Sequence, residues 1–312
     1  MKNPLSQFLH CWRWWRSLQS EGFFSWEDAT KQIDRVILPS RFAFKKAGEK
    51  LGRQTRITSI NETTSKIEIL EQDLLFYWHG PIDNNLYFLI EQEFDQENPH
   101  CYTTSPIQLS PESLVIDVGA CEGLFAYRLL KQGQCGHVIC FEPLDSMAKL
   151  VERGAIENGV ANSLTVESLA VSDVSGPVRL VATDNPDACH IETCPPNSPE
   201  ADAQAIRLDE YLETNHISLS QHDLIKVDAE GADLSVIEGA AKTIARDRPQ
   251  IAITTYHDDT HVKAISERLR ELNPSYQFRL KGFSHWTTRP RPVLLQASSV
   301  SVTASQGGAK VP

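Results

Sequence analysis

The sequence of 312 residues has a net charge of -11, 41% hydrophobic residues and seven cysteines. This length allows one large domain or a core with a smaller appendage, and the hydrophobic content is sufficient for a full core. A membrane-spanning helix is not expected, because no run of 18 apolar residues occurs. The negative charge disfavours nonspecific binding to nucleic acids. An odd number of cysteines without a regular spacing favours reduced thiols and hence a cytoplasmic protein.

The N-terminal region, predicted over residues 1–110, differs from the rest in charge. Residues 1–56 contain 11 Lys and Arg against 5 Asp and Glu, whereas the remainder has 19 against 36. The segment from Pro4 to Ile37 is predicted to form one or two helices. Its aromatic and basic residues are Phe8, Trp12, Trp15, Arg13 and Arg16. Two interpretations are open: the aromatic face packs onto the main domain, or it contacts a membrane or a lipid-linked substrate from the periphery.

Short alternating apolar runs between Thr55 and Ile90 predict a small antiparallel meander. Its four predicted strands are Arg56–Ile60, Lys66–Leu70, Leu74–Trp78 and Leu86–Ile90. Pro106 and Pro111 mark a linker to the main domain, which is predicted over residues 111–297. The tail, residues 298–312, is rich in Ser, Gly and Ala and is expected to be disordered.

The main domain begins with a strand, a glycine turn and a helix, which form the first unit of a nucleotide-type α/β fold. An apolar run ends at Asp117-Val118-Gly119, and helical periodicity restarts at Leu124. Strands and helices then alternate, which predicts a doubly wound, Rossmann-like α/β fold with a mostly parallel sheet. Ala170–Asp173 and Val178–Val181 are expected to form an inserted hairpin. Thr183–Ala203 is predicted as a loop long enough to be a lid.

The turn after the first strand indicates the kind of nucleotide. A dinucleotide turn requires glycine where Cys121 stands, because the backbone must approach the pyrophosphate. Asp117, Glu122 and Glu142 also make the site acidic, which would repel a pyrophosphate but suits the ammonium, sulfonium and ribose of S-adenosylmethionine. Glu142 lies roughly 20 residues past the turn, the distance at which an acid binds ribose hydroxyls. The turn residues expected at the cofactor are Gly119, Ala120, Cys121 and Gly123.

Five motifs of the main domain are distinctive in sequence. They are Asp117-Val118-Gly119-Ala120, Phe141-Glu142-Pro143, Ala170-Val171-Ser172-Asp173, Arg207-Leu208-Asp209 and Lys226-Val227-Asp228-Ala229-Glu230-Gly231. In this order they resemble FkbM-type methyltransferases, which are class I, S-adenosylmethionine-dependent enzymes assigned mostly to O-methylation of sugars or polyketide hydroxyls. The resemblance covers about Glu112 to Gln296, and the last motif is the most discriminating. Family members usually have Asn where Cys121 stands.

The resemblance implies a seven-stranded sheet whose last strand is antiparallel. It also implies that Asp117 holds the methionine ammonium, directly or through water, and that Glu142 accepts both ribose hydroxyls. Glu167 or Ser168, after the third strand, would meet the adenine. The amine of Lys226 is expected to pair with an acid.

Three side chains fall where this fold places the reacting methyl group: Asp228 and Glu230 after the fourth strand, and His257 after the fifth. A neutral His257 is expected to deprotonate an acceptor hydroxyl near pH 7. Asp228 is the alternative base or orients the acceptor, and Glu230 anchors the turn by accepting backbone N–H groups. The competing interpretations are a histidine bonded to Asp258 or Asp259 and carboxylates that only cap a helix. An alternative stays open in which Asp228 and a nearby acid bind Mg²⁺ and polarise a diol. Nothing in the sequence completes that ligand set, so no metal is expected.

The expected function is therefore O-methylation, with S-adenosylmethionine as donor, of a hydroxyl on a sugar, glycolipid or secondary metabolite. The partner is a small-molecule or glycan acceptor and not a nucleic acid. Two other classes stay open: an NAD-dependent oxidoreductase, and a non-catalytic binding module that keeps the methyltransferase fold.

Overall fold

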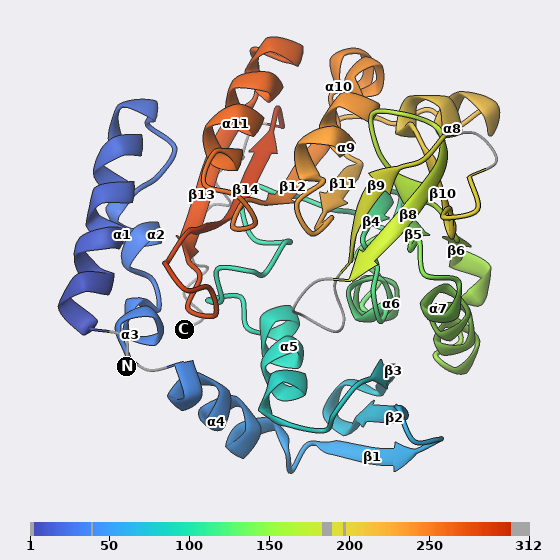
Figure 1. Cartoon of the computed structure of the whole chain (residues 1–312), viewed down its shortest axis with the longest axis horizontal. Coiled ribbons are helices and arrows are strands. Elements are labelled where there is room, and N and C mark those ends of the chain that lie inside the picture. Colours follow the sequence, from blue (N-terminus) through green and yellow to red (C-terminus); the bar gives the residue numbers. More distant parts are fainter. Residues whose placement is uncertain (1–2, 39, 183–188, 196–197, 301–312) are drawn as a thin grey trace, which may run out of the picture.

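The computed structural model describes residues 3–38, 40–182, 189–195 and 198–300, and it centres on a seven-stranded sheet (Figure 1). The strands run in the order β13-β14-β12-β11-β4-β5-β6. Their bounds are β4 (Leu114–Val118), β5 (His137–Phe141), β6 (Leu164–Glu167), β11 (Leu224–Val227), β12 (Gln250–Thr254), β13 (Gln277–Phe283) and β14 (Pro292–Ser298). Neighbours from β12 to β6 pair in parallel, whereas β14 is antiparallel to both β12 and β13. This confirms the predicted α/β fold with an antiparallel last strand.

Helices cover both faces of this sheet. Successive residues of each strand point to opposite faces and therefore into two different hydrophobic cores. Ile116 and Ile225 point into one core, which contains residues of α8 (Leu208–Thr214), α9 (Asp233–Gly239), α10 (Ala241–Asp247) and α11 (His261–Leu272). Val115 and Leu224 point into the other, which contains residues of α6 (Leu124–Lys131) and α7 (Asp145–Glu157). The short 3-10 helix η3 (Ala161–Ser163) precedes β6.

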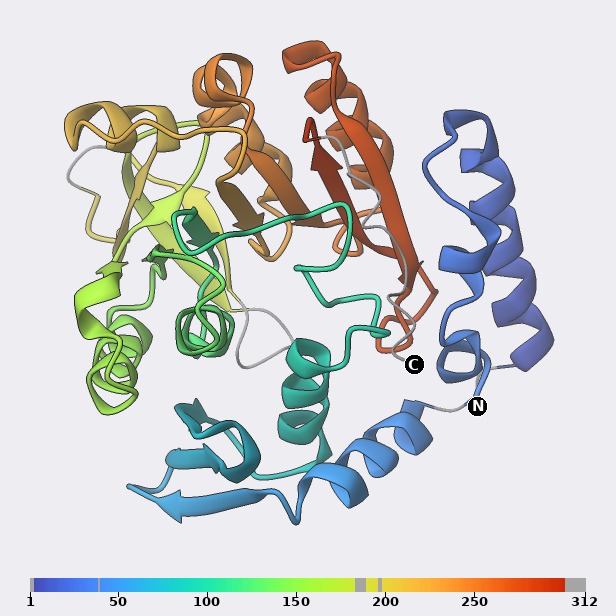
Figure 2. The ribbon, with the colours of Figure 1, turned by 180° about the vertical axis from the view of Figure 1, so that it is seen from behind.

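The first helices lie beside the β13 edge of the sheet, as both views show (Figures 1 and 2). They are α1 (Pro4–Leu18), the 3-10 turn η1 (Gln19–Glu21), α2 (Trp26–Thr30) and α3 (Ile33–Ile37). The buried side chains of Cys11, Leu18 and Phe23 belong to the same core as the sheet. The guanidinium of Arg279 on β13 also pairs with the Asp28 carboxylate. The N-terminal helices therefore share the main hydrophobic core.

A second N-terminal unit lies along the bottom of the view in Figure 1. It comprises α4 (Ser40–Leu51), β1 (Thr55–Ser59), β2 (Thr64–Ile69), η2 (Leu70–Gln72), β3 (Leu74–His79) and α5 (Asn84–Phe94). The first three predicted strands form an antiparallel sheet in the order β1-β2-β3. The fourth prediction is wrong, since Leu86–Ile90 belongs to α5. Asp83 caps this helix by accepting from the Asn85 N–H, and Leu86 and Ile90, one turn apart, are fully buried.

A small four-stranded sheet follows β6 and corrects the predicted hairpin. Its strands are β7 (Ala170–Val171), β8 (Gly176–Ala182), β9 (Cys189–Thr193) and β10 (Ala203–Ile206), in the order β7-β10-β8-β9. β7 and β8 do not pair with each other, because β10 lies between them and its buried Ala205 packs against Ala170 and Val178. The predicted lid, Thr183–Ala203, contains β9, and its residues 183–188 and 196–197 lie outside the described part.

Two further expectations concern the ends of the chain and the membrane. The predicted tail lies outside the described residues from position 301 onward, and β14 ends at Ser298. Among the helices that the structure describes, none has the length and apolar character that a membrane span requires.

Candidate active site

A cavity of about 510 Å³ opens at the carboxyl ends of the central strands. Its wall includes the turn after β4 (Gly119–Glu122), the end of β5 at Glu142, and the residues after β11 from Asp228 to Glu230. Parallel α/β sheets bind ligands at this edge, because the strand ends and helix starts leave a crevice there. The remaining wall is largely apolar and comes from α5, α6 and the segments around Tyr102 and Trp286.

The turn after β4 is held tightly against the neighbouring strand ends. The N–H groups of Gly119 and Ala120 both donate to the carbonyl of Phe141, at 3.0 and 3.2 Å. Gly119 has a φ of +76°, and a Cβ at this position would lie 2.0 Å from the backbone oxygen of Asp228. Only glycine fits such an approach without displacing β11. The turn therefore depends on Gly119, which lines the cavity together with Ala120 and Cys121.

Glu142 lies on the cavity wall with its carboxylate fixed by two backbone groups. Oε2 accepts from the N–H of Cys121 at 3.0 Å, and Oε1 accepts from the N–H of Leu144 at 3.0 Å. The residue is 6% exposed, and this burial raises the pKa of its carboxyl to about 7, although the two N–H donors favour the charged form. Each carboxylate oxygen retains a lone pair for a further donor, such as a hydroxyl group.

Asp117 is placed differently from the sequence expectation of a cofactor contact. Its side chain is fully buried and does not line the cavity, because parallel pairing of β4 and β11 sets it beside Lys226. The two charged groups are 2.9 Å apart, and the Lys226 amine also donates to the carbonyl of Gly119 at 2.7 Å. Burial lowers the pKa of Lys226, but the carboxylates of Asp117 and Asp228 raise it above its ordinary value. The Asp117 carboxylate thus fixes the position of the Lys226 amine, and this amine binds the backbone of the turn after β4.

The predicted adenine contacts at Glu167 and Ser168 are also not on the cavity wall, whereas the following Leu169 is. Glu167 turns away because the hydroxyl of Tyr211 on α8 donates to its Oε1 at 2.8 Å. Gly123, the last predicted turn glycine, is outside the wall as well. It has a φ of +73° and precedes α6, where a Cβ would lie 2.8 Å from the Tyr127 ring.

His257 does not have the neutral, cavity-facing ring expected of a general base. Its Nδ1 lies 2.9 Å from Asp233 Oδ2, and its side chain, 9% exposed, is not part of the cavity wall. Burial lowers the pKa of His257, but the Asp233 hydrogen bond and the nearby Glu230 carboxylate raise it well above its usual value. A proton on the ring is thus favoured, which argues against His257 as the base that takes a proton from an acceptor.

Asp233 has the anchoring role that the sequence assigned to Glu230. Its carboxylate accepts from the N–H groups of Ala229 at 3.0 Å and Gly231 at 3.2 Å, so that it closes the turn into α9. Glu230 instead lies on the cavity wall beside Asp228. Asp228 accepts from the Tyr102 hydroxyl at 2.7 Å, so it serves as more than a helix cap.

The comparison with protein families identifies the main domain. A model of the methyltransferase FkbM domain matches residues 117–280, which is just over half of the chain. The chain belongs to the FkbM methyltransferase family. The resemblance inferred from the five motifs is thereby confirmed. No curated protein matches the chain.

Three solved methyltransferase structures are similar in fold to this FkbM-family chain. Methyltransferase FkbM from Methylobacillus flagellatus KT is 22% identical over 68% of this chain and 52% of its own length, with a TM-score of 0.47. Precorrin-6y C5,15-methyltransferase from Geobacter metallireducens GS-15 is 13% identical over 67% of this chain and 90% of its own length, with a TM-score of 0.40. An O-methyltransferase from Bacillus cereus in complex with SAH is 12% identical over 60% of this chain and 74% of its own length, with a TM-score of 0.38. The chain thus spans about half the length of the first structure.

The aromatic part of the wall lies mostly outside the matched FkbM segment, and the sequence analysis did not predict it. Tyr256 and Trp286 meet edge to face, with ring centroids 5.2 Å apart. Trp286 also contacts Phe88 at 5.7 Å and His100 at 5.9 Å. These side chains come from α5, from the segment before β4, from the residues after β12 and from the loop between β13 and β14. No pattern within one segment could indicate a wall assembled from residues so far apart in sequence.

Proposed function

We propose that this FkbM-family chain transfers a methyl group from S-adenosylmethionine to a hydroxyl of a carbohydrate or another hydroxylated small molecule. One observation carries the proposal: a single cavity is lined by Glu142 and the glycine turn, and also by Asp228, Glu230 and aromatic rings. The first set suits a ribose-containing donor, and the second suits an uncharged acceptor whose hydroxyl must be oriented.

The residues around the turn fit this donor. Glu142 presents a buried carboxylate that can accept from ribose hydroxyls, and Gly119 allows the turn to lie against the backbone of Asp228. When bound, S-adenosylmethionine supplies a methyl group that is already activated by its sulfonium. The protein then has to hold the acceptor oxygen in line with the methyl group and accept its proton. Asp228 and Glu230, two of the acidic groups on the wall, can orient the hydroxyl.

The acceptor class is inferred from the composition of the wall. Aromatic side chains such as Tyr102, Tyr256 and Trp286 provide flat apolar surfaces, while Asp228 provides an acceptor for hydroxyl groups. A sugar offers both a C–H face and several hydroxyls, so this combination favours a carbohydrate. An NAD-dependent reaction is disfavoured, since Cys121 replaces the glycine that a pyrophosphate needs.

Calorimetry with the purified chain tests the donor, and labelled methyl transfer tests the reaction. We expect micromolar binding of S-adenosylhomocysteine and no heat of binding with NAD⁺. We then expect label from methyl-labelled S-adenosylmethionine to enter a metabolite that gains one methyl group, identified by mass spectrometry of a cell extract. Binding of NAD⁺ in place of S-adenosylhomocysteine would overturn the proposal. Binding of S-adenosylhomocysteine without any transfer would instead assign a binding module.

We also propose that α1 brings the chain to an anionic lipid surface or a lipid-linked glycan. Leu5, Phe8, Leu9 and Trp12 are between 37% and 65% exposed on this helix, whereas the partly buried Trp15 donates to the carbonyl of Phe24. Residues 1–56 carry a positive balance of 6 within a chain of net charge -11. Apolar and basic groups on one helix are typical of interfacial binding.

Vesicle sedimentation tests this association. More of the chain should sediment with phosphatidylglycerol vesicles than with phosphatidylcholine vesicles, because the basic region is attracted to anionic headgroups. The variant Trp12→Ala should sediment several-fold less with the anionic vesicles. The variant Ile156→Ala is the matched control, because Ile156 is an exposed apolar residue on α7, outside the basic N-terminal region. Equal sedimentation with both vesicle types contradicts the proposal.

A further inference from the structure

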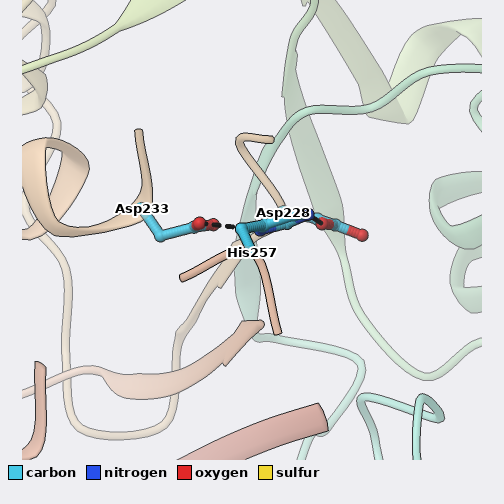
Figure 3. A group of neighbouring side chains, drawn as sticks. All are labelled: Asp228, Asp233 and His257. Atoms are coloured by element: carbon cyan, nitrogen blue, oxygen red, sulfur yellow. Dashed lines mark hydrogen bonds and ion pairs between the residues drawn. The ribbon is translucent and has the colours of Figure 1, made fainter. Parts of the chain in front are cut away.

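Four ionisable side chains from two strand–helix connections meet beside the cavity. Asp228 and Glu230 follow β11, Asp233 begins α9, and His257 follows β12. Figure 3 shows the imidazole of His257 with Asp233 on one side and Asp228 close by. The Nε2 atom of His257 lies 3.4 Å from Glu230 Oε2 and 3.6 Å from Asp228 Oδ1. Three carboxylates thus surround one imidazole, an arrangement with excess negative charge.

Of the two ring nitrogens of His257, Nδ1 forms a hydrogen bond and Nε2 does not. Nδ1 lies 2.9 Å from Asp233 Oδ2, and this contact fixes the orientation of the ring. Nε2 is buried but makes no hydrogen bond, although it is directed toward Asp228 and Glu230. A buried ring nitrogen without a hydrogen bond costs free energy unless a group outside the chain binds it.

The carboxylate of Asp228 is oriented by its own set of neighbours. The Tyr102 hydroxyl donates to Oδ2 at 2.7 Å, and the Thr254 hydroxyl lies 3.0 Å from Oδ1. The Asp233 carboxylate, which holds His257, is in turn held by backbone N–H groups. Metal ligands in proteins are oriented in this way, with a carboxylate on the second nitrogen of a histidine and hydrogen bonds to each ligating carboxylate.

We propose that His257 Nε2, Asp228 Oδ1 and Glu230 Oε2 bind a divalent transition-metal ion in the cavity wall, while Asp233 orients the imidazole. Two ligands bound at about 2.1 Å in a tetrahedral arrangement are about 3.4 Å apart, which agrees with both Nε2–oxygen separations. One imidazole with two carboxylates suits Zn²⁺ or Mn²⁺, whereas Mg²⁺ prefers oxygen ligands and water. The ion takes the place of the proton on Nε2, which is released to the solvent on binding.

The role of this ion rests on the proposed function. Asp228 and Glu230 line the cavity, so positions of the ion not taken by the protein face the acceptor. A hydroxyl bound there loses its proton to water at lower pH, because the ion stabilises the oxyanion. The ion would supply the activation that His257 was expected to provide by accepting the proton.

Metal titration of the intact chain, dialysed first against a chelator, tests the site without an activity assay. We expect one equivalent of Co²⁺ to give visible absorption bands of a nitrogen- and oxygen-ligated ion, and Zn²⁺ to displace it. The variant His257→Gln should abolish the bands, and Glu230→Gln should weaken Co²⁺ binding at least tenfold. Glu267→Gln, an exposed change on α11, is the matched control and should leave binding unchanged.

Two further measurements keep the outcome clear. Glu230 has a side chain that is 34% exposed, so Glu230→Gln should fold, and circular dichroism checks this. The variant Asp233→Asn should weaken Co²⁺ binding about 10- to 100-fold through the orientation of His257. S-adenosylhomocysteine binding is measured on the same samples. Absence of Co²⁺ and Zn²⁺ binding while S-adenosylhomocysteine still binds overturns the metal site alone, whereas metal binding without S-adenosylhomocysteine binding overturns the proposed function alone.

Discussion

The variant Glu142→Ala is expected to bind S-adenosylhomocysteine about 100-fold more weakly than the wild-type chain. The proposed role of Glu142 is to accept hydrogen bonds from two ribose hydroxyls, and each bond to a charged group is worth about 1.5 kcal/mol. Since 1.4 kcal/mol corresponds to a factor of ten, two lost bonds give about 100-fold. Calorimetry with both proteins measures this ratio directly.

The variant Glu152→Ala is the matched control, because Glu152 is exposed on α7, the helix that follows Glu142. Its affinity for S-adenosylhomocysteine should equal that of the wild type. Glu142→Ala also removes the acceptor of the Cys121 and Leu144 N–H groups, so circular dichroism must show that the variant is folded. A folded Glu142→Ala variant with wild-type affinity would count against the assignment of the cofactor site.

The raised pKa of Glu142 should make cofactor binding depend on pH. Glu142 is buried, and its pKa is raised to about 7, so it is protonated below and ionised above this value. Only the ionised form offers both oxygens as acceptors to the ribose. The dissociation constant for S-adenosylhomocysteine should therefore be about tenfold larger at pH 6 than at pH 8. The variant Glu142→Gln, which has no ionisable group here, should show no such dependence, and a flat wild-type profile would contradict the prediction.

The parts of the structure that could be predicted from sequence are those specified by local pattern. The turn at Gly119, the acid at Glu142 and the strand ending at Asp228 follow from apolar runs that end in glycine or acids, and each lines the cavity. Leu86–Ile90 shows the limit of this approach. Its mixture of aromatic and branched residues matches a strand, but the cap at Asp83 and the burial of one helical face stabilise the helix α5 instead.

The partners of charged groups could not be predicted, because they depend on register and on contacts between distant segments. Asp117 pairs with Lys226 because β4 and β11 are neighbours in register, which no spacing within one strand indicates. The competing interpretation of His257 was a bond to Asp258 or Asp259, but its partner is Asp233, at the start of α9 on the preceding strand–helix unit. The chemistry of the site therefore differs from the sequence prediction more than its location does.

The Asp117–Lys226 pair leads to the largest expected effect on stability. The variant Lys226→Met should lower the free energy of unfolding by about 3–5 kcal/mol, because it leaves the Asp117 carboxylate buried without its partner. Both side chains are almost fully buried, at 0% and 5% exposure, and their charged atoms are 2.9 Å apart. The variant also removes the donor to the Gly119 carbonyl, so S-adenosylhomocysteine binding should weaken as the turn loosens. Urea denaturation and calorimetry measure the two effects.

The variant Lys131→Met is the matched control for this change. Lys131 forms an ion pair of similar length, 2.8 Å, with Asp73, but the Asp73 side chain is 96% exposed and the pair is screened by water. This control should leave both stability and binding nearly unchanged. The double variant Asp117→Leu/Lys226→Met should recover much of the lost stability, because it removes both buried charges. It should not recover the affinity for S-adenosylhomocysteine, since the Gly119 carbonyl still lacks its donor. If Lys226→Met were as stable as the control, the buried pair would not be what holds the turn in place.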